Sequence, residues 1–184
     1  MKKPIRSGTI LLAEPFMMDP NFKRTAVLLV DHGEEGSIGF VLNRESDVRV
    51  DELVDDFPEF DAPVYVGGPV GRDTVHYLHR KGDLLEGSDE VVRGVFWGGD
   101  YERLKFLIRQ QLIDPRDIRF FVGYSGWSDD QLDQELALGS WVTARMDANY
   151  LFKSPADTLW SQEMDHKGNA ISVIEDKEEE AKYN

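Results

Sequence analysis

The stretch that decides the fold is Gly123-Tyr124-Ser125-Gly126-Trp127-Ser128-Asp129-Asp130-Gln131-Leu132. It follows the apolar run 118–122, which has the composition of a buried strand, and it leads into the amphipathic segment 129–138. The stretch therefore predicts a strand, a tight turn and a helix, with Ser125 at the turn. Such a turn either presents a catalytic nucleophile or begins a helix, and this choice decides whether the protein is an enzyme.

Two observations favour a helix start over a catalytic turn. A hydrolase nucleophile turn has glycines two residues before and two residues after the serine, but Trp127 occupies the second of these positions. A serine triad also needs a histidine later in the chain, and only His166 follows Ser125. Ser128 instead begins a Ser-x-x-Gln capping box, which is typical of a helix N-terminus. A hydrolase-like enzyme that uses Ser125 stays an alternative, and the sequence leans against an enzyme.

The length and composition indicate one globular domain in a reducing compartment. A chain of 184 residues suffices for one full core, and the absence of cysteine excludes disulfides, thiolate zinc sites and cysteine nucleophiles. Residues 9–174 are expected to form the domain, after a flexible lead-in at 1–8 and before an acidic disordered tail at 175–184. No apolar run approaches the ~20 residues that cross a bilayer, and no signal-peptide pattern occurs, so we expect a cytoplasmic protein without a membrane partner.

The charge of the chain disfavours nucleic acid as a partner. The formal net charge is −14, from 35 acidic and 21 basic residues. Residues 175–184 hold five acids and two lysines and account for −3, so −11 is spread over the body. That charge repels phosphates at long range, and the helix predicted over 129–138 is acidic where a recognition helix would be basic. A direct DNA-binding regulator is therefore a second alternative that the charge disfavours.

Apolar runs divided by turn residues predict an α+β domain. The expected strands are 9–13, 25–30, 37–42, 64–66, 74–79, 90–97, 118–122, 140–144 and 170–174, and the expected helices are 50–56, 100–113, 129–138 and 155–164. The strands 25–30 and 37–42 should form a hairpin, and neither alternates polar with apolar residues, so both should be buried on two faces. Hairpins mixed with strand–helix–strand units predict one mixed sheet rather than a doubly wound parallel sheet.

The glycine turns and histidines indicate neither a cofactor nor a metal. Asp100 follows Gly98-Gly99, where a phosphate-binding loop would have a lysine, so we expect it to cap the helix that begins there. His76 and His79 lie three residues apart in a predicted strand and should face opposite sides, which argues against a shared metal. No His-Glu-x-x-His motif or calcium-loop spacing occurs. We therefore assign no catalytic, cofactor-binding or metal-binding residue.

Several blocks of the chain, in order between Gly8 and Trp160, resemble the YqgE/AlgH family of bacterial proteins. The blocks are 11–15 (LLAEP), 19–25 (DPNFKRT), 39–44 (GFVLNR), 67–70 (GGPV), 123–127 (GYSGW) with Gln131, Leu132 and Glu135, 140–141 (SW) and 151–152 (LF). The resemblance implies a single α+β domain in which a bifurcated mixed sheet forms a pseudo-barrel with flanking helices. It supplies no catalytic residues, although some members of the family carry a transcriptional-regulator label.

The leading hypothesis from the sequence is a non-enzymatic binding or regulatory protein whose effect runs through a protein partner. The candidate binding surface consists of turn residues with special geometry, namely Asn43, Arg44, Gly67, Gly68, Pro69, Tyr124, Ser125 and Trp127. Within it, Arg44 would pair with an anionic group, and Tyr124 with Trp127 would form an apolar wall. The partner, whether protein or small molecule, and the oligomeric state are left open.

Overall fold

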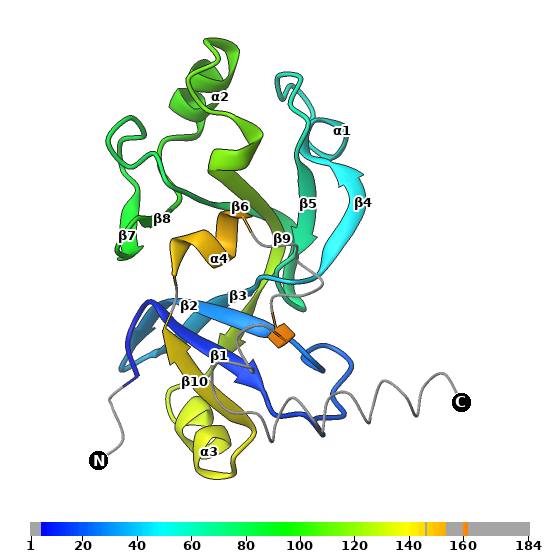
Figure 1. The fold of residues 1–184 in the computed structure, drawn as a ribbon, viewed down its shortest axis with the longest axis vertical. Helices are drawn as coiled ribbons and strands as arrows, with labels where there is room; N and C mark the ends of the chain where they lie inside the picture. Colours follow the sequence, from blue (N-terminus) through cyan, green and yellow to red (C-terminus); the bar gives the residue numbers. More distant parts are fainter. Residues whose placement is uncertain (1–4, 146, 154–159, 162–184) are drawn as a thin grey trace.

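The computed structural model describes residues 5–145, 147–153 and 160–161. These residues form one mixed β-sheet that divides into two halves (Figure 1). In chain order the elements are β1 (Thr9–Ala13), β2 (Ala26–Gly33), β3 (Gly36–Val41), β4 (Glu45–Arg49), α1 (Val50–Leu53), β5 (Pro63–Val66), β6 (Val70–His79), β7 (Asp89–Val92), β8 (Val95–Trp97), α2 (Tyr101–Arg109), the 3-10 helix η1 (Pro115–Asp117), β9 (Ile118–Trp127), α3 (Gln131–Ala137), β10 (Trp141–Arg145) and α4 (Ala148–Lys153).

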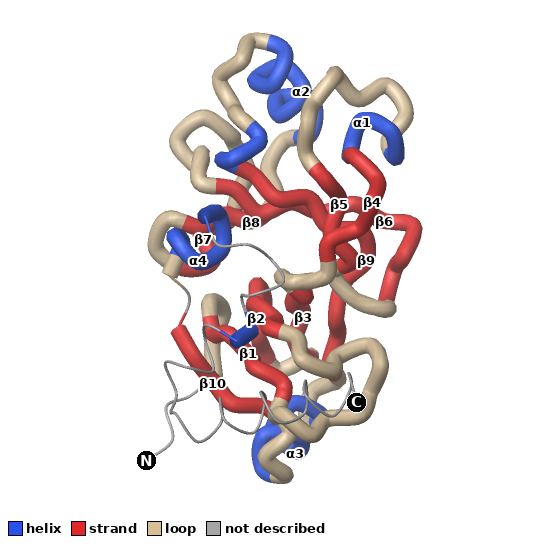
Figure 2. Tube along the Cα trace, turned by 45° about the vertical axis from the view of Figure 1, so that its right-hand side comes forward, coloured by secondary structure: helices blue, strands red, loops and turns tan. Residues whose placement is uncertain are grey.

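The long strand β9 is the point at which the sheet divides. The strand order is β10-β1-β2-β3-β9-β6-β8-β7, and β5 branches off by pairing with both β4 and β9. The β5–β9 pair is parallel and the other pairs are antiparallel. The end of β9 at 125–127 pairs with β3, and its earlier part pairs with β5 and β6. The single α+β domain with a bifurcated sheet is therefore confirmed, and α1 and α2 lie at the opposite end from α3 (Figure 2).

Alternation along the strands divides the core into three clusters. On β2, Leu28 packs into an inner cluster with Phe40, Phe121 and other side chains, and α4 covers this cluster with Leu151. The neighbouring residue, Leu29, points to the other face, where α3 packs. The predicted burial of β2 on two faces is confirmed. A third cluster lies under α1 and α2.

The tight turn predicted at Ser125 is wrong, because β9 stays extended as far as Trp127. Residues 125–127 pair with 37–39 of β3, and this tertiary pairing outweighs the local turn signal at Gly126. The helix α3 begins later, at Gln131, whose Oε1 accepts from the Ser128 N–H at 3.1 Å. This is one half of the predicted capping box; Asp130, the N-cap residue, makes no side-chain capping bond.

Two other differences concern the second half of the chain. The single strand predicted over 90–97 is a hairpin of β7 and β8, which turns at Gly94 with φ 84°. The helix α4 was not predicted, and the helix expected over 155–164 lies outside the described residues except at 160–161, which are helical. The strand expected over 170–174 and the lead-in and tail expected at 1–8 and 175–184 also fall outside the described residues, apart from residues 5–8.

Candidate functional site

The turns expected to form a binding surface do meet, but they meet as a closed glycine junction, defined here as Gly67, Gly68, Gly123 and Ser125. The Gly67 carbonyl accepts from the Val41 N–H at 2.8 Å and from the Ser125 hydroxyl at 3.1 Å. A Cβ at Gly123 would lie 2.6 Å from the Gly68 carbonyl oxygen, so only glycine permits this approach. The junction fixes the start of β6 and the end of β5 against β9.

Ser125 has the environment of a structural serine. Its side chain is fully buried, and its hydroxyl proton is engaged by the Gly67 carbonyl. A nucleophilic serine needs an accessible hydroxyl that hands its proton to a base. The position of Ser125 inside β9 therefore contradicts the nucleophile-turn geometry on which the hydrolase alternative rested.

Asn43 and Arg44 hold the long loop between β1 and β2. The Asn43 side chain accepts from the Ala26 N–H at 3.1 Å and donates to the Arg24 carbonyl at 2.9 Å. The Arg44 guanidinium donates to the Lys23 carbonyl at 2.7 Å. Through these bonds, both residues stabilise the loop. The binding of an anion by Arg44 stays a prediction.

Tyr124 and Trp127 lie on opposite faces of β9, so the predicted apolar wall is wrong. The Tyr124 ring lies 5.9 Å from the ring of His76 beside the inner cluster. The Trp127 ring packs in the cluster under α3, where its Nε1 and that of Trp141 both donate to Glu135 Oε1, at 3.4 and 3.1 Å. Residues three apart in a strand cannot share a face.

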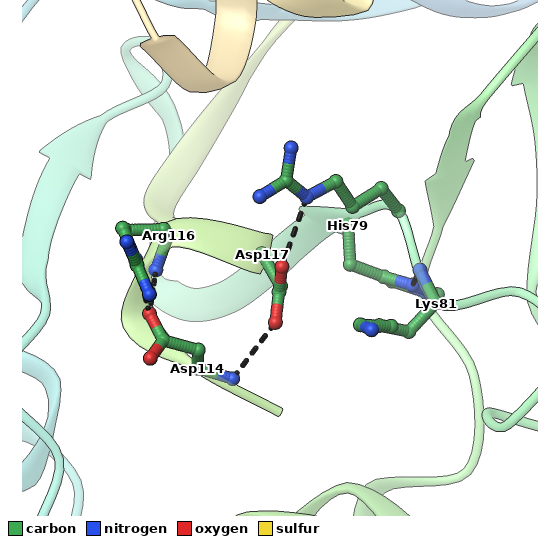
Figure 3. A network of polar contacts seen from close by, with 6 residues as sticks. His79, Lys81, Asp114, Arg116 and Asp117 are labelled. Carbon is green, nitrogen blue, oxygen red and sulfur yellow. Dashed lines mark hydrogen bonds and ion pairs between the residues drawn. The ribbon is translucent and has the colours of Figure 1, made fainter. Parts of the chain in front are cut away.

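The histidines of β6 serve the fold. His79 Nε2 donates to the Gly98 carbonyl at 2.8 Å, so Nδ1 is the acceptor for the Lys81 N–H at 3.1 Å, next to the polar network of Figure 3. Burial lowers the pKa of His79, which keeps it neutral. His76 faces the other side of the strand, beside Phe40, as the sequence predicts. Within the described part of the chain, no three His, Asp or Glu side chains are placed to hold a metal ion.

A groove that the sequence did not reveal runs between residues 57–61 and the C-terminal end of α2. Its volume is about 840 Å³, and a neighbouring hollow of about 430 Å³ shares Arg49 and Glu59 with it. We call the two together the α1–α2 groove. Its apolar lining is Phe57, Pro58, Phe60, Ile108, Ile113 and Pro115, and its polar lining is Arg49, Asp51, Glu52, Glu59, Asp61, Arg109, Gln111 and Asp114.

A three-part latch holds one wall of this groove. Arg49 donates to both carboxylate oxygens of Asp51, at 3.1 Å from Nε and 2.6 Å from Nη2. Asp51 Oδ2 also accepts from the Phe60 N–H at 2.9 Å, which fixes the loop that carries the apolar lining. The hydrogen bond from Arg49 lowers the pKa of Asp51 below its usual range, so this carboxylate is ionised at neutral pH.

The opposite wall is held by the polar network of η1 (Figure 3). After α2 ends, Gln111 takes the left-handed conformation, with φ 60°, and the chain returns towards β9. The Asp117 carboxylate accepts from the Asp114 N–H and from Arg80 Nε, both at 2.9 Å. A hydrogen bond from Arg116 lowers the pKa of Asp114, which lines the groove. Both walls are therefore anchored by charged hydrogen bonds to the sheet.

The α1–α2 groove is acidic, and the segments that form it carry exposed apolar side chains. Its lining has five carboxylates and two arginines, and Arg49 is already paired. On the bordering elements, Leu53, Phe106 and Leu112 are 44%, 45% and 50% exposed.

The sequence contained one partial signal for this groove. Phe106 falls off the apolar stripe that Leu104, Leu107 and Ile108 form on α2, so its exposure could be expected. Leu112 follows that stripe, but α2 ends at Arg109 and leaves it exposed. The opposing wall at 57–61 is far away in sequence and carried no signal.

Comparison with known proteins agrees with this architecture. The AlgH-like family model matches residues 10–172. A UPF0301 protein of Chlorobaculum tepidum is 44% identical over 170 residues, which cover 92% of this chain and 91% of the relative, and one from Cytophaga hutchinsonii is 33% identical over 171 residues, covering 92% and 94%. The solution structure of the AlgH protein from Pseudomonas aeruginosa has a TM-score of 0.74 at 30% identity, over 95% of this chain and 96% of that one. The crystal structure of protein DIP2367 from Corynebacterium diphtheriae has a TM-score of 0.77 at 20% identity, over 95% and 94%, and shows the fold alone.

The fold defines a single-domain α+β protein whose curled mixed sheet divides at one central strand. The chain belongs to the AlgH-like family, also named UPF0301. Among the described residues, no helix has the length and apolar character needed to cross a membrane.

Proposed function

We propose that the protein is a non-enzymatic cytoplasmic binding protein whose α1–α2 groove receives a basic, partly apolar segment of a partner protein. The observation that carries the proposal is the groove itself, with its anchored walls, apolar floor and excess of carboxylates. A regulatory effect, including the transcriptional role attached to some relatives by label, would then run through that partner.

The chemistry of the groove favours binding a cation over proton transfer. A general acid at neutral pH needs a raised carboxyl pKa, whereas hydrogen bonds lower the pKa of Asp51 and of Asp114. Both groups therefore stay ionised, but Arg49 and Arg116 already pair with them. The carboxylates of the lining that would attract lysine or arginine are Glu52 and Glu59, which make no ion pair with an arginine within the described residues. The same charge works against direct DNA binding, because phosphates would be repelled.

The size and lining of the groove suit a short peptide segment. Phe57 and Phe60 are buried and contribute only an apolar edge to the lining, and Glu59 borders both hollows. The latch fixes the wall beforehand, which lowers the entropy cost of binding. The surface expected from the sequence stays a separate proposal. Its accessible members are Pro69, which is exposed, and Asn43, Arg44 and Tyr124, which are half-buried.

The test compares partner capture by four full-length variants. Glu59→Lys reverses a charge in the groove and Leu112→Asp removes an exposed apolar side chain at its border, and both should abolish capture of the partner from native cell extract. Glu34→Lys, in the β2–β3 turn, and Leu138→Asp, beside α3, are the matched controls and should capture the partner as the unchanged protein does. Because all four positions are exposed, unfolding stability should change by about 0.5 kcal/mol or less in each.

Cross-linking mass spectrometry identifies the segment that contacts the groove. The expected result is a cross-link between residues near 57–61 and a lysine- or arginine-rich segment of the captured protein. Equal capture by the groove variants and the controls would refute the proposal, as would a partner segment that is acidic.

A further inference from the structure

Within the part of the chain that the structure describes, one arginine lies inside the sheet without a carboxylate in ion-pair contact. Arg119, on β9, is 8% exposed and is placed opposite Leu78 of β6, so it points to the side of the inner cluster. Its guanidinium lies over the ring of Tyr65, 4.4 Å from the ring centroid. This site is separate from the α1–α2 groove and does not depend on the function proposed for it.

Most of the hydrogen-bonding capacity of Arg119 is unused. The guanidinium has five N–H donors, and in the described residues it makes one hydrogen bond, from Nη1 to the Leu42 carbonyl at 3.3 Å. No described carboxylate lies within ion-pair distance of it. The guanidinium nitrogens of Arg119 that make no hydrogen bond are not fully buried, so solvent reaches them. The hydroxyl of Tyr65 likewise makes no hydrogen bond within the described residues and is not sealed.

The surroundings of Arg119 do not compensate its charge. Burial lowers the pKa of Arg119, and the electrostatic effects of Tyr65 and Glu45 only partly oppose this shift. Glu45 is exposed and pairs with Tyr65 across the β4–β5 ladder. A cation that is desolvated without a partner is unfavourable, and proteins normally pair such a group with an anion.

The geometry is that of an oxyanion receptor. The contact with the Tyr65 ring covers one face of the guanidinium and leaves hydrogen-bond donors on its edge unused. The arginine fork matches the two oxygens of a carboxylate or phosphate. We propose that Arg119 and Tyr65 form a small-anion site, in which the guanidinium edge binds two oxygens of a carboxylate or phosphate group and the Tyr65 hydroxyl donates to it. A lysine at this position would lack both the stack and the fork.

The test measures thermal unfolding of the full chain in inorganic phosphate or in acetate, against chloride at equal ionic strength. We expect one of the two oxyanions to raise the Tm by about 2–4 °C in a saturable manner. A response to phosphate assigns a phosphate ligand, and a response to acetate assigns a carboxylate. Arg119→Gln should lose the response, and Arg93→Gln, at an exposed arginine, should keep it.

Three further measurements separate binding from folding. Tyr65→Phe keeps the ring beside Arg119 but removes the hydroxyl, and it should lower the affinity for the anion several-fold. Arg119→Met removes an unbalanced charge and should be at least as stable as the unchanged protein in chloride. In the unchanged protein, the ¹⁵Nε resonance of Arg119 should shift during the same titration, and this readout needs no variant. The proposal is overturned if the Tm is the same in all three salts and the Arg119 resonance does not move. It is also overturned if Arg119→Gln keeps the response of the unchanged protein.

Discussion

The glycine junction and the α1–α2 groove use their polar groups in opposite ways. In the junction, the Gly67 carbonyl takes two hydrogen bonds and the backbones of Gly68 and Gly123 approach too closely for any side chain. In the groove, hydrogen bonds between charged groups hold the walls in place, while further carboxylates of the lining stay exposed to solvent. The comparison teaches that conspicuous glycines mark where strands must touch, whereas a binding surface can be built from residues with no motif at all.

The largest effect should come from closing the space at the junction. Gly123→Ala places a Cβ 2.6 Å from the Gly68 carbonyl at a φ of 72°, so both strain and a backbone clash oppose the native state. We expect the free energy of unfolding to fall by about 3 kcal/mol or more, because a rigid backbone cannot move aside cheaply. Chemical denaturation measures the change.

Gly139→Ala is the matched control for this substitution. Gly139 has a φ of 78°, but no atom lies within 4 Å of the added Cβ. Its substitution therefore introduces backbone strain without a clash and should lower the free energy of unfolding by about 1 kcal/mol. Equal losses at the two positions would show that the junction is not closely packed.

An intermediate effect is expected from the latch of the groove. Asp51→Asn removes the charged, two-oxygen acceptor of Arg49 and weakens the bond from the Phe60 N–H, and should cost about 1–2 kcal/mol. Asp61→Asn is the control, because Asp61 is exposed and 3.8 Å from Arg49, and it should cost less than about 0.5 kcal/mol. Urea denaturation of both variants measures the difference.

The pH dependence of the same latch has a definite sign. The folded state lowers the pKa of Asp51, so the unfolded chain takes up its proton first as the pH falls. The stabilising contribution of Asp51 is present above the unfolded pKa of about 3.9 and is lost as the pH falls through the lower folded value. Asp51→Asn should be less sensitive to acid over that window, and identical acid profiles would contradict the role given to the latch.

The smallest effect should be a gain in stability at the other wall of the groove. Gln111 holds a left-handed conformation that glycine adopts without strain, so Gln111→Gly should stabilise the protein by about 0.5 kcal/mol after the flexibility of glycine is subtracted. Gln110→Gly, at a φ of −84°, relieves nothing and should destabilise it. A loss of stability in Gln111→Gly would show that its side chain contributes more than its backbone costs.

Local patterns predicted the parts of the fold that neighbours in sequence decide. The β2–β3 hairpin, the helix capped by Asp100 and the opposite facing of His76 and His79 follow from periodicity and capping, and all three are confirmed. Ser125 and the 90–97 segment were misassigned, because pairing partners elsewhere in the chain determine whether a glycine is a turn or part of a strand.

The candidate sites depend on contacts that no local pattern contains. The groove needs 57–61 and 108–115 to come together, and the position of the Arg119 guanidinium depends on Tyr65 and Leu42, which are distant in the chain. By itself the sequence determined most of the elements, the acidic charge, the absence of thiol chemistry and, by resemblance, the family. Only the tertiary structure decided which polar groups form hydrogen bonds within the fold and which stay accessible to a ligand. The reason is that burial and hydrogen bonding depend on residues distant in the chain.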